Sequence, residues 1–268
     1  MSKWLPLLLL FSALAGATPQ RIVSLTPHIT ELLYLIGAGD RIVATDDASD
    51  TPPEARRLPH VANYRSINSE ALLAQQPDLV VAWRPAQARM LEPVARLGVP
   101  VFYSDPTDFA SLSGEMRALG QLLGVTTQAN AAADAFDARL AQLRERYGKK
   151  EPVRVFYQLW NPPLTSVSGI AWPAQAITLC GGNNVVGEAT SPYPQIGIEE
   201  VLRANPQLIV AGSQHEAVLE HWRQWPMLEA VRRDALVLVN PDQLHRFTPR
   251  ALTAVEALCQ AIDAVRHP

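Results

Sequence analysis

The sequence predicts an α/β protein in which two similar lobes are joined by one long connector helix. Strand-like runs alternate with helical patterns in both halves of the chain. A helix–proline–strand unit occurs once in each half, which indicates that the halves are built alike. Between them lies a run without Gly or Pro, residues 127–147, and such a run favours one uninterrupted helix.

The first residues predict export. Lys3 supplies a short positive region, Trp4–Leu14 is apolar, and Ala15–Ala17 has the small-x-small pattern of a cleavage site. The apolar run is shorter than the roughly 20 residues that span a bilayer, so a signal peptide at 1–17 is favoured over an N-terminal anchor helix. We expect a mature chain that begins at Thr18 and resides in the periplasm.

The first lobe is predicted at residues 18–125. Its strands are rich in β-branched or aromatic residues and lie at Arg21–Leu25, Arg41–Thr45, Asp78–Trp83 and Pro100–Ser104. Helical patterns separate them, at Ile29–Ile36, Ser69–Gln76, Gln87–Leu97 and Asp108–Leu123. This alternation is typical of a parallel sheet with helices on its faces.

The connector is predicted at residues 126–149. Thr127–Tyr147 is rich in Ala, Leu, Gln and Arg, and at 1.5 Å per residue it gives a helix of about 30 Å. The alternative is an ordinary surface helix of one lobe. Its place between two α/β halves favours a rigid connector, which limits relative motion of the lobes.

The second lobe is predicted at residues 150–268. The same alternation returns, with strands at Val153–Leu159, Gln207–Gly212 and Ala235–Asn240. Its helices are predicted at Ala174–Cys180, Glu199–Ala204, Trp225–Arg232 and Pro249–Val265.

The repeated unit has the pattern E-x-[LV]-L-x3-P-x-L-[VI]-V-A. It begins at Glu70 in the first lobe and at Glu199 in the second. Each copy predicts a short helix that starts at a glutamate, a turn with proline, and a buried strand. A carboxylate in the first turn also opposes the helix dipole favourably, so the pattern alone leaves open whether the two glutamates bind a partner.

Charge and cysteines narrow the function classes. A formal net charge of -3 argues against nucleic acid, because binding phosphates needs a clustered basic surface. The two cysteines, Cys180 and Cys259, form an even count in an oxidising compartment, which favours a disulfide over two buried thiols.

Catalytic motifs are missing from the sequence. It contains no G-x-S-x-G nucleophile elbow, no H-E-x-x-H metal helix and no G-x-x-x-x-G-K-[ST] phosphate loop. His28 and Glu31 have a spacing that places them on one helical face, which is a weak metal signal by itself. We therefore predict a binding protein rather than an enzyme, with no metal site and no resident cofactor.

Aromatic and polar residues fall where loops follow the predicted strands, at the carboxyl ends where α/β sheets bind ligands. Flat rings suit a large planar ligand, and Asp and Arg side chains hydrogen-bond peripheral amides. Each aromatic taken singly also fits a core or rim position. The candidate ligand-binding residues are Tyr64, Trp83, Arg84, Trp160, Tyr193, Asp242, Gln243, Leu244, His245 and Arg246.

The chain resembles the periplasmic vitamin B12-binding proteins, a family of helix-linked (class III) solute-binding proteins, over nearly all of its mature length. The matching segments are Arg21–Leu33 (RIVSLTPHITELL), Ser49–Pro53 (SDTPP), Pro77–Arg84 (PDLVVAWR), Asn161–Ser166 (NPPLTS), Cys180–Asn184 (CGGNN), Pro192–Gln195 (PYPQ) and Asp242–Arg250 (DQLHRFTPR). The opening strand and the PDLVVA run are shared with siderophore and haem binders, whereas AWR, NPPLTS, LCGGNN and PYPQ are more specific.

The resemblance implies two Rossmann-like lobes with a corrinoid held in the cleft between them, as a transported ligand. It implies that Glu70 and Glu199 face arginines on the permease of an ABC importer, whose ATPase subunits hydrolyse ATP. Cys180 and Cys259 match the family's disulfide pair. The residues that match its ligand loop are Asp242 to Arg246. No nucleic acid and no direct membrane insertion are implied.

Several aromatic residues of the family are replaced here. Tyr64 and Tyr193 stand where the best-known members have tryptophan, and Ala48, Gln243 and Leu244 also replace aromatic residues. The smaller stacking area is expected to lower affinity or to shift preference toward a trimmed corrinoid such as cobinamide.

The alternative ligand on the same scaffold is haem or a ferric siderophore. Haem requires an axial ligand to iron, for which His28, His245 and Tyr64 are the candidates. A siderophore favours several cationic side chains around an anionic chelate, and here only Arg84 and Arg246 are available.

Overall fold

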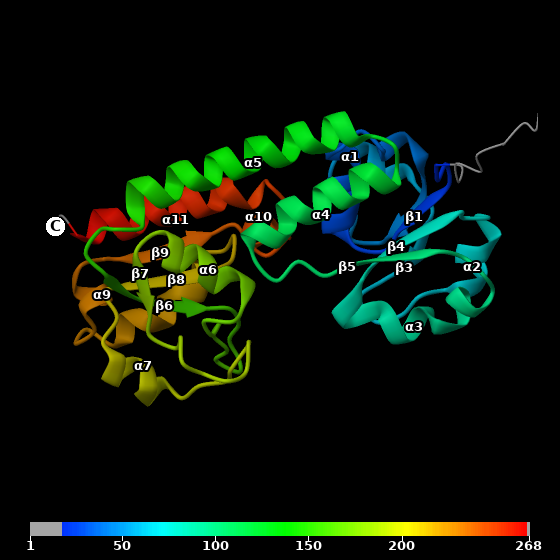
Figure 1. Cartoon of the computed structure of the whole chain (residues 1–268). Helices are drawn as coiled ribbons and strands as arrows, with labels where there is room; N and C mark the ends of the chain where they lie inside the picture. Colours follow the sequence, from blue (N-terminus) through cyan, green and yellow to red (C-terminus); the bar gives the residue numbers. More distant parts are fainter. Residues whose placement is uncertain (1–17, 267–268) are drawn as a thin grey trace, which may run out of the picture.

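The computed structural model describes residues 18–266, and the predicted signal peptide therefore lies outside the described residues. Two parallel sheets form the two lobes (Figure 1). The first has the strand order β3-β2-β1-β4-β5 and the second has the order β7-β6-β8-β9. The predicted α/β fold of two Rossmann-like lobes is confirmed. No helix among the described residues is long and apolar enough to cross a membrane.

The strands of the first lobe are mostly apolar because helices cover both faces of the sheet. These strands are β1 (Ile22–Ser24), β2 (Ile42–Asp46), β3 (His60–Ala62), β4 (Leu79–Trp83) and β5 (Val101–Ser104). The α-helices are α1 (Pro27–Leu35), α2 (Ser69–Ala74), α3 (Arg84–Arg96) and α4 (Phe109–Leu122), with 3-10 turns η1 (Gly39–Arg41) and η2 (Pro53–Arg57). Sequence patterns missed β3, a three-residue edge strand.

The second lobe repeats the arrangement with one strand fewer. Its strands are β6 (Val153–Gln158), β7 (Gly182–Asn184), β8 (Leu208–Gly212) and β9 (Leu236–Val239). The α-helices are α6 (Trp172–Leu179), α7 (Ile198–Ala204), α8 (Ala217–Glu220), α9 (Glu229–Arg232), α10 (Pro241–Leu244) and α11 (Ala251–Arg266), with one 3-10 turn, η3 (His221–Gln224). Strand β7 was missed because Gly-Asn-Asn carries no β-branched residue.

One predicted helix is wrong in its first half. The pattern predicted a helix over Trp225–Arg232, but only α9 is helical. Trp225 has φ −112° and ψ 68°, which lies outside the α region. Pro226 accounts for this, because a proline ring pushes the residue before it out of the helical conformation.

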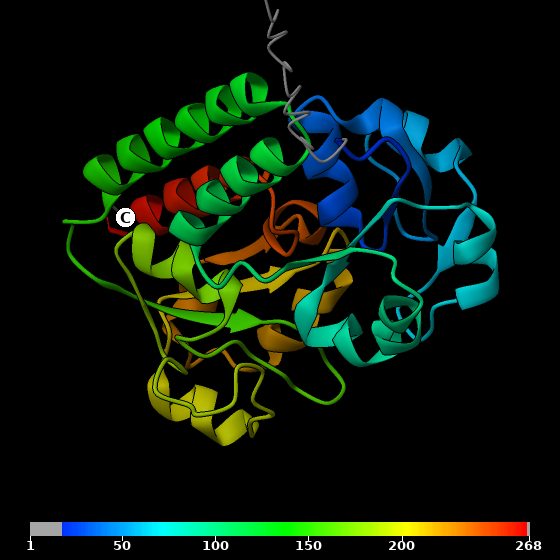
Figure 2. The same ribbon diagram turned by 45° about the vertical axis from the view of Figure 1, so that its right-hand side comes forward.

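The predicted connector is one continuous helix, α5 (Thr126–Tyr147), which runs along both lobes (Figure 1). Helix α4 packs beside its first half and α11 beside its second half, as both views agree (Figure 2). Its buried side chains recur at intervals of three or four residues, which gives a single apolar stripe. That stripe is Ala129, Ala133, Phe136, Leu140, Leu143 and Tyr147.

The stripe joins an apolar core that both lobes share. Ile22 and Val81 of the first sheet belong to the same buried cluster as Val155 and Val210 of the second. Separate, smaller clusters cover the other face of each sheet. The lobes are therefore joined by packing as well as by the chain.

The repeated sequence unit folds in the same way twice. Gln76 and Asn205, each directly before a proline, both adopt left-handed backbone conformations, with φ 48° and 43°. In each lobe an arginine at the start of a central strand, β1 or β6, donates a hydrogen bond to the carbonyl of this left-handed residue. Arg21 Nε donates to Gln76 O at 3.2 Å, and Arg154 Nε donates to Asn205 O at 3.1 Å. Neither arginine was singled out from the sequence.

The two cysteines form a disulfide, as predicted. Cys180 directly follows α6, Cys259 lies in α11, and both are completely buried. The bond therefore ties the last helix of the chain into the second lobe.

Candidate functional site: a cleft between the lobes

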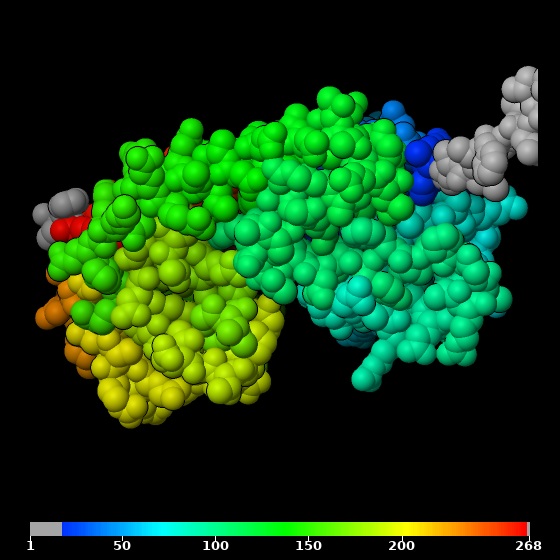
Figure 3. All heavy atoms as spheres, in the orientation of Figure 1, coloured from blue at the N-terminus to red at the C-terminus, as the bar shows by residue number. Residues whose placement is uncertain are grey.

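The cleft lies where the carboxyl ends of both sheets meet. Trp83 ends β4 in the first lobe, and Phe247 follows α10 in the second. Their ring centroids are 5.9 Å apart, so residues distant in sequence meet at this junction. The space-filling view shows the surface hollowed between the lobes, on the side opposite α5 (Figure 3).

Three predicted ligand residues expose large aromatic rings. Tyr64 is 83% exposed, Trp160 is 65% exposed and Tyr193 is 48% exposed. Trp160 and Tyr193 lie on adjoining loops, because Thr165 bridges both Trp160 and Gln195. Several large exposed rings on loops of both lobes are typical of a surface that a ligand covers.

A set of aromatic contacts, here called the aromatic floor, joins the two lobes at the cleft. Trp83 and His28 of the first lobe pack against Phe247 of the second, with His28–Phe247 centroids 5.4 Å apart. Phe247 also packs on Trp172 at 4.7 Å, and Trp172 packs on Phe109 at 4.6 Å. Of these residues, Trp83 was predicted as a corrinoid contact and His28 only as a candidate axial ligand for haem. Phe247 lies one residue beyond the predicted ligand loop and was missed.

Arg84 is held at the edge of the first lobe, where it begins α3. Its guanidinium carbon lies 4.8 Å from the centre of the Tyr103 ring, and its Nε is 3.5 Å from Asp105 Oδ2. The side chain is half exposed, so its remaining N–H groups are free to donate to a ligand.

The predicted ligand loop is not an open loop, and this corrects one residue assignment. Residues 241–244 form the helical turn α10, whose inner face packs on the core. Leu244 is completely buried, so its side chain contacts the core and does not reach the cleft. Asp242 is exposed and Gln243 partly exposed, so these two remain candidates.

His245 and Arg246 are also engaged by the protein. Tyr157 Oη and His245 Nε2 are 2.7 Å apart. Arg246 donates from Nη1 to Glu31 at 2.7 Å and to Asp50 at 2.8 Å, and its side chain is only 14% exposed. The structure thus assigns Arg246 first to a contact between the lobes.

The histidines give the haem alternative little support. His28 is buried, with Nδ1 3.1 Å from Thr26 Oγ1 and Nε2 3.4 Å from Ser104 Oγ. His245 is partly buried and its Nε2 is within hydrogen-bond distance of Tyr157, so Tyr64 is the one fully exposed residue among the three axial candidates. No cluster of three metal-binding side chains occurs within residues 18–266.

Burial strongly lowers the pKa of two histidines. The pKa of His28 falls to about 3 through desolvation, aided by the charge of Arg246. Desolvation lowers the pKa of His245 to about 4, although Asp242 opposes the shift. In the unfolded chain both recover pKa values near 6.5, so on acidification below that value the unfolded chain takes up protons that the folded protein does not.

The free energy of unfolding is therefore expected to fall as the pH falls below 6.5. Between pH 6.5 and pH 5, each histidine lowers the free energy of unfolding by about 1.4 kcal/mol per pH unit, which amounts to about 2 kcal/mol at pH 5. The measurement is urea unfolding at pH 7, 6 and 5. His28→Gln should show a smaller loss than the wild type.

The exposed His60→Gln variant is the matched control. Burial raises the pKa of Asp46 and of Glu115, and both carboxyls oppose the trend. Because they are present in every variant, the difference in slope between His28→Gln and the wild type isolates the histidine. Equal slopes would contradict the assignment.

The two glutamates of the repeat occupy equivalent positions. Glu70 is the second residue of α2 and Glu199 the second residue of α7. Both are exposed, and neither forms an ion pair with any residue in the described part of the chain. The carboxylates are thus available to an external partner.

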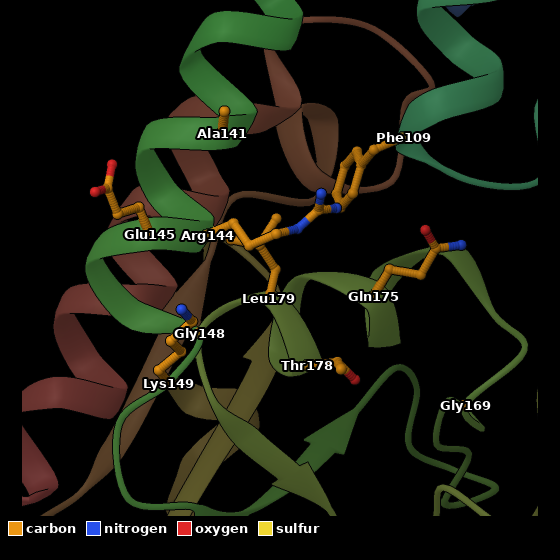
Figure 4. A pocket seen from close by; sticks show the side chains of 10 residues that line it. All are labelled: Phe109, Ala141, Arg144, Glu145, Gly148, Lys149, Gly169, Gln175, Thr178 and Leu179. Carbon is orange, nitrogen blue, oxygen red and sulfur yellow. The ribbon is translucent and has the colours of Figure 1, made fainter.

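A separate hollow of about 640 Å³ lies between α5 and α6 (Figure 4). Arg144 extends across it toward Phe109, whereas Glu145 points away. None of the predicted ligand residues lines it, so it is distinct from the cleft.

Comparison with known proteins finds relatives over nearly the whole chain. Residues 22–241 match the family described as periplasmic binding protein. The Vitamin B12-binding protein of Vibrio parahaemolyticus is 35% identical over 266 residues, covering 98% of this chain and 97% of the relative.

Solved structures of periplasmic binding proteins share the fold of this chain. The periplasmic vitamin B12-binding protein BtuF of Vibrio cholerae superposes with a TM-score of 0.87 at 36% identity, covering 94% of this chain and 99% of that one. The periplasmic heme-binding protein HutB of Vibrio cholerae superposes with a TM-score of 0.80 at 19% identity, covering 93% and 99%. At that identity the likeness to HutB concerns the fold alone.

Proposed function

The chain belongs to the family of periplasmic binding proteins, and from that premise we propose that it captures vitamin B12 or a related corrinoid between its lobes and delivers it to an ABC importer. The single observation that carries the proposal is that both lobes contribute exposed aromatic rings on loops, together with an aromatic contact that joins the lobes at the cleft. Full-length similarity to vitamin B12-binding proteins supports it.

Ligand capture in this proposal is non-covalent. A corrin ring presents a broad, mostly apolar face, which Tyr64, Trp160 and Tyr193 cover by contact. Arg84 donates to carbonyl oxygens of the ligand's peripheral amides, and Asp242 accepts from their N–H groups. The corrinoid is cargo rather than a resident cofactor, and the chain performs no chemistry itself.

Processing and delivery complete the proposal. The first 17 residues direct export and are removed after Ala17, so that the mature protein starts at Thr18 in the periplasm. Glu70 and Glu199 then dock on arginines of a membrane permease, one from each lobe. Charge pairs of this kind set orientation and encounter rate more than raw affinity.

Titration calorimetry of the mature protein tests the ligand. Cyanocobalamin or cobinamide is expected to bind, and haemin and ferric siderophores are expected not to. Tyr64 and Tyr193 stand where the family has tryptophan, and Gln243 replaces an aromatic residue, so the stacking area is smaller. Cobinamide is therefore expected to compete well with cyanocobalamin, the larger ligand. Binding of haemin without binding of either corrinoid would overturn the proposal.

Trp160→Ala and Tyr193→Ala test whether the exposed aromatic rings of the second lobe contact the ligand. Each removes a ring proposed to stack on the ligand. Such a contact contributes about 0.5–1.5 kcal/mol beyond its buried area, so corrinoid affinity should fall by at least about two- to ten-fold per variant. Leu97→Ala, which trims a 68% exposed side chain at the end of α3, is the matched control and should bind like the wild type.

A further inference from the structure

One buried carboxylate of the first lobe binds two arginines of the second. Glu31 lies on α1, and its side chain is 7% exposed. Arg250 binds it through two hydrogen bonds, Nε to Oε2 at 3.1 Å and Nη2 to Oε1 at 2.6 Å. Arg246 donates to the same Oε1 at 2.7 Å. The two hydrogen bonds from Arg250 fix the orientation of its guanidinium relative to the Glu31 carboxylate as well as the distance between the two groups.

Asp50 extends this contact and completes what we call the interlobe ion cluster (Glu31, Asp50, Arg246 and Arg250). Arg246 Nη1 lies 2.8 Å from Asp50 Oδ1. Burial raises the pKa of Asp50, but the hydrogen bond and charge of Arg246 outweigh burial and hold the pKa below its ordinary value. Asp50 is therefore ionised at neutral pH, and the cluster carries two positive and two negative charges.

The cluster also determines where the cleft floor lies. Its two arginines flank Phe247 in the sequence, and Phe247 packs against Trp83 and His28 of the first lobe. The segment 246–250 is thus held to the first lobe by ions on both sides of the ring. The ion cluster thus adds a contact between the lobes at the cleft to the chain connection and the apolar packing along α5.

We propose that Glu31 is a positioning residue for ligand capture: by holding Arg246 and Arg250, it sets the spacing of the lobes and seats Phe247 in the floor of the cleft. Glu31 itself does not touch the ligand. Loss of its charge leaves Arg250 without a carboxylate partner among the described residues and leaves Arg246 with Asp50 and, at 3.5 Å, Asp242. The weakened contact favours separation of the lobes. The effect on ligand affinity rests on the proposed function, whereas the effect on lobe spacing does not.

The second lobe offers a matched control. Glu229 has a side chain 15% exposed and also binds two arginines, Arg154 at 2.8 Å and Arg233 at 2.7 Å. All three residues belong to the second lobe. Glu31→Gln and Glu229→Gln therefore remove equivalent charges, but only the first breaks a contact between lobes.

The experiment measures lobe spacing and affinity in the same variants. Spin labels are attached at Ala95→Cys on α3 and Arg203→Cys on α7, two exposed positions. Pulsed electron–electron double resonance then reports the distance between the lobes. Glu31→Gln should broaden and lengthen the distance distribution and weaken cyanocobalamin binding about ten-fold, a loss typical of coupling between sites. Glu229→Gln should change neither.

Three results overturn the proposal: an unchanged distance distribution in Glu31→Gln, an equal change in Glu229→Gln, or altered spacing with unaltered affinity. Should Glu31→Gln fail to fold, Arg250→Gln replaces it, since that arginine is 34% exposed and less buried than Glu31. If the wild type binds no corrinoid, the proposed function fails, and the distance distributions still decide whether Glu31 holds the lobes.

Discussion

Reversing the charges of Glu70 and Glu199 together is expected to impair delivery to the permease severely without changing ligand affinity. Both carboxylates are exposed at the second position of short helices, one in each lobe. With lysine at both positions, like charges would face each other at the proposed docking surface, and such contacts cost several kcal/mol. Corrinoid uptake by cells that contain the matching permease should fall by roughly a hundred-fold.

The control variant reverses the charges of two other exposed glutamates, Glu54 in the first lobe and Glu216 in the second. This Glu54→Lys/Glu216→Lys variant carries the same change in net charge, so it separates local docking from general electrostatics. Calorimetry on each variant reports the ligand affinity. Loss of corrinoid binding in Glu70→Lys/Glu199→Lys would place these residues in the cleft and contradict a docking role.

Removing the disulfide is expected to destabilise the protein strongly. The bond closes a loop with a sequence separation of 79 residues. In the chain-entropy model this contributes about 4.5 kcal/mol, which corresponds to a fall of roughly 10–15 °C in Tm for a protein of this size. Cys180→Ala/Cys259→Ala should show this loss in thermal and urea unfolding.

Reduction of the wild type with a thiol reagent provides the control, because it opens the same loop without changing side-chain volume. The reduced wild type and the alanine variant should unfold at similar temperatures. An alanine variant that is as stable as the oxidised wild type would show that the closed loop does not determine stability.

Local patterns predicted most of the fold because they depend on burial and turn chemistry. The long helix α5 follows from a run without Gly or Pro, and the sheets follow from runs such as Pro77–Ala82 and Pro206–Ala211. The patterns failed where few residues carry the signal. Strands β3 and β7 have three residues each, and Pro226 interrupts a pattern that periodicity alone reads as helical.

The site was predictable only in its outer part. Tyr64, Trp160 and Tyr193 were predicted because they are aromatic residues in loops, and of the three only Trp160 directly follows a predicted strand. Leu244 was misassigned because the family match identifies a loop without showing which side chains of a helical turn face inward. The pairing of Glu31 with Arg250 was beyond reach, since it joins residues 219 apart in the chain.

The apolar core that continues beneath α5 has a consequence for how the molecule unfolds. Ile22 and Val155 belong to different sheets, yet they lie in one buried cluster. Melting one lobe is expected to uncover apolar surface that α5 shares with the other lobe, and so to destabilise that lobe as well. We therefore expect the two lobes to unfold as one cooperative unit, despite the internal duplication visible in the sequence.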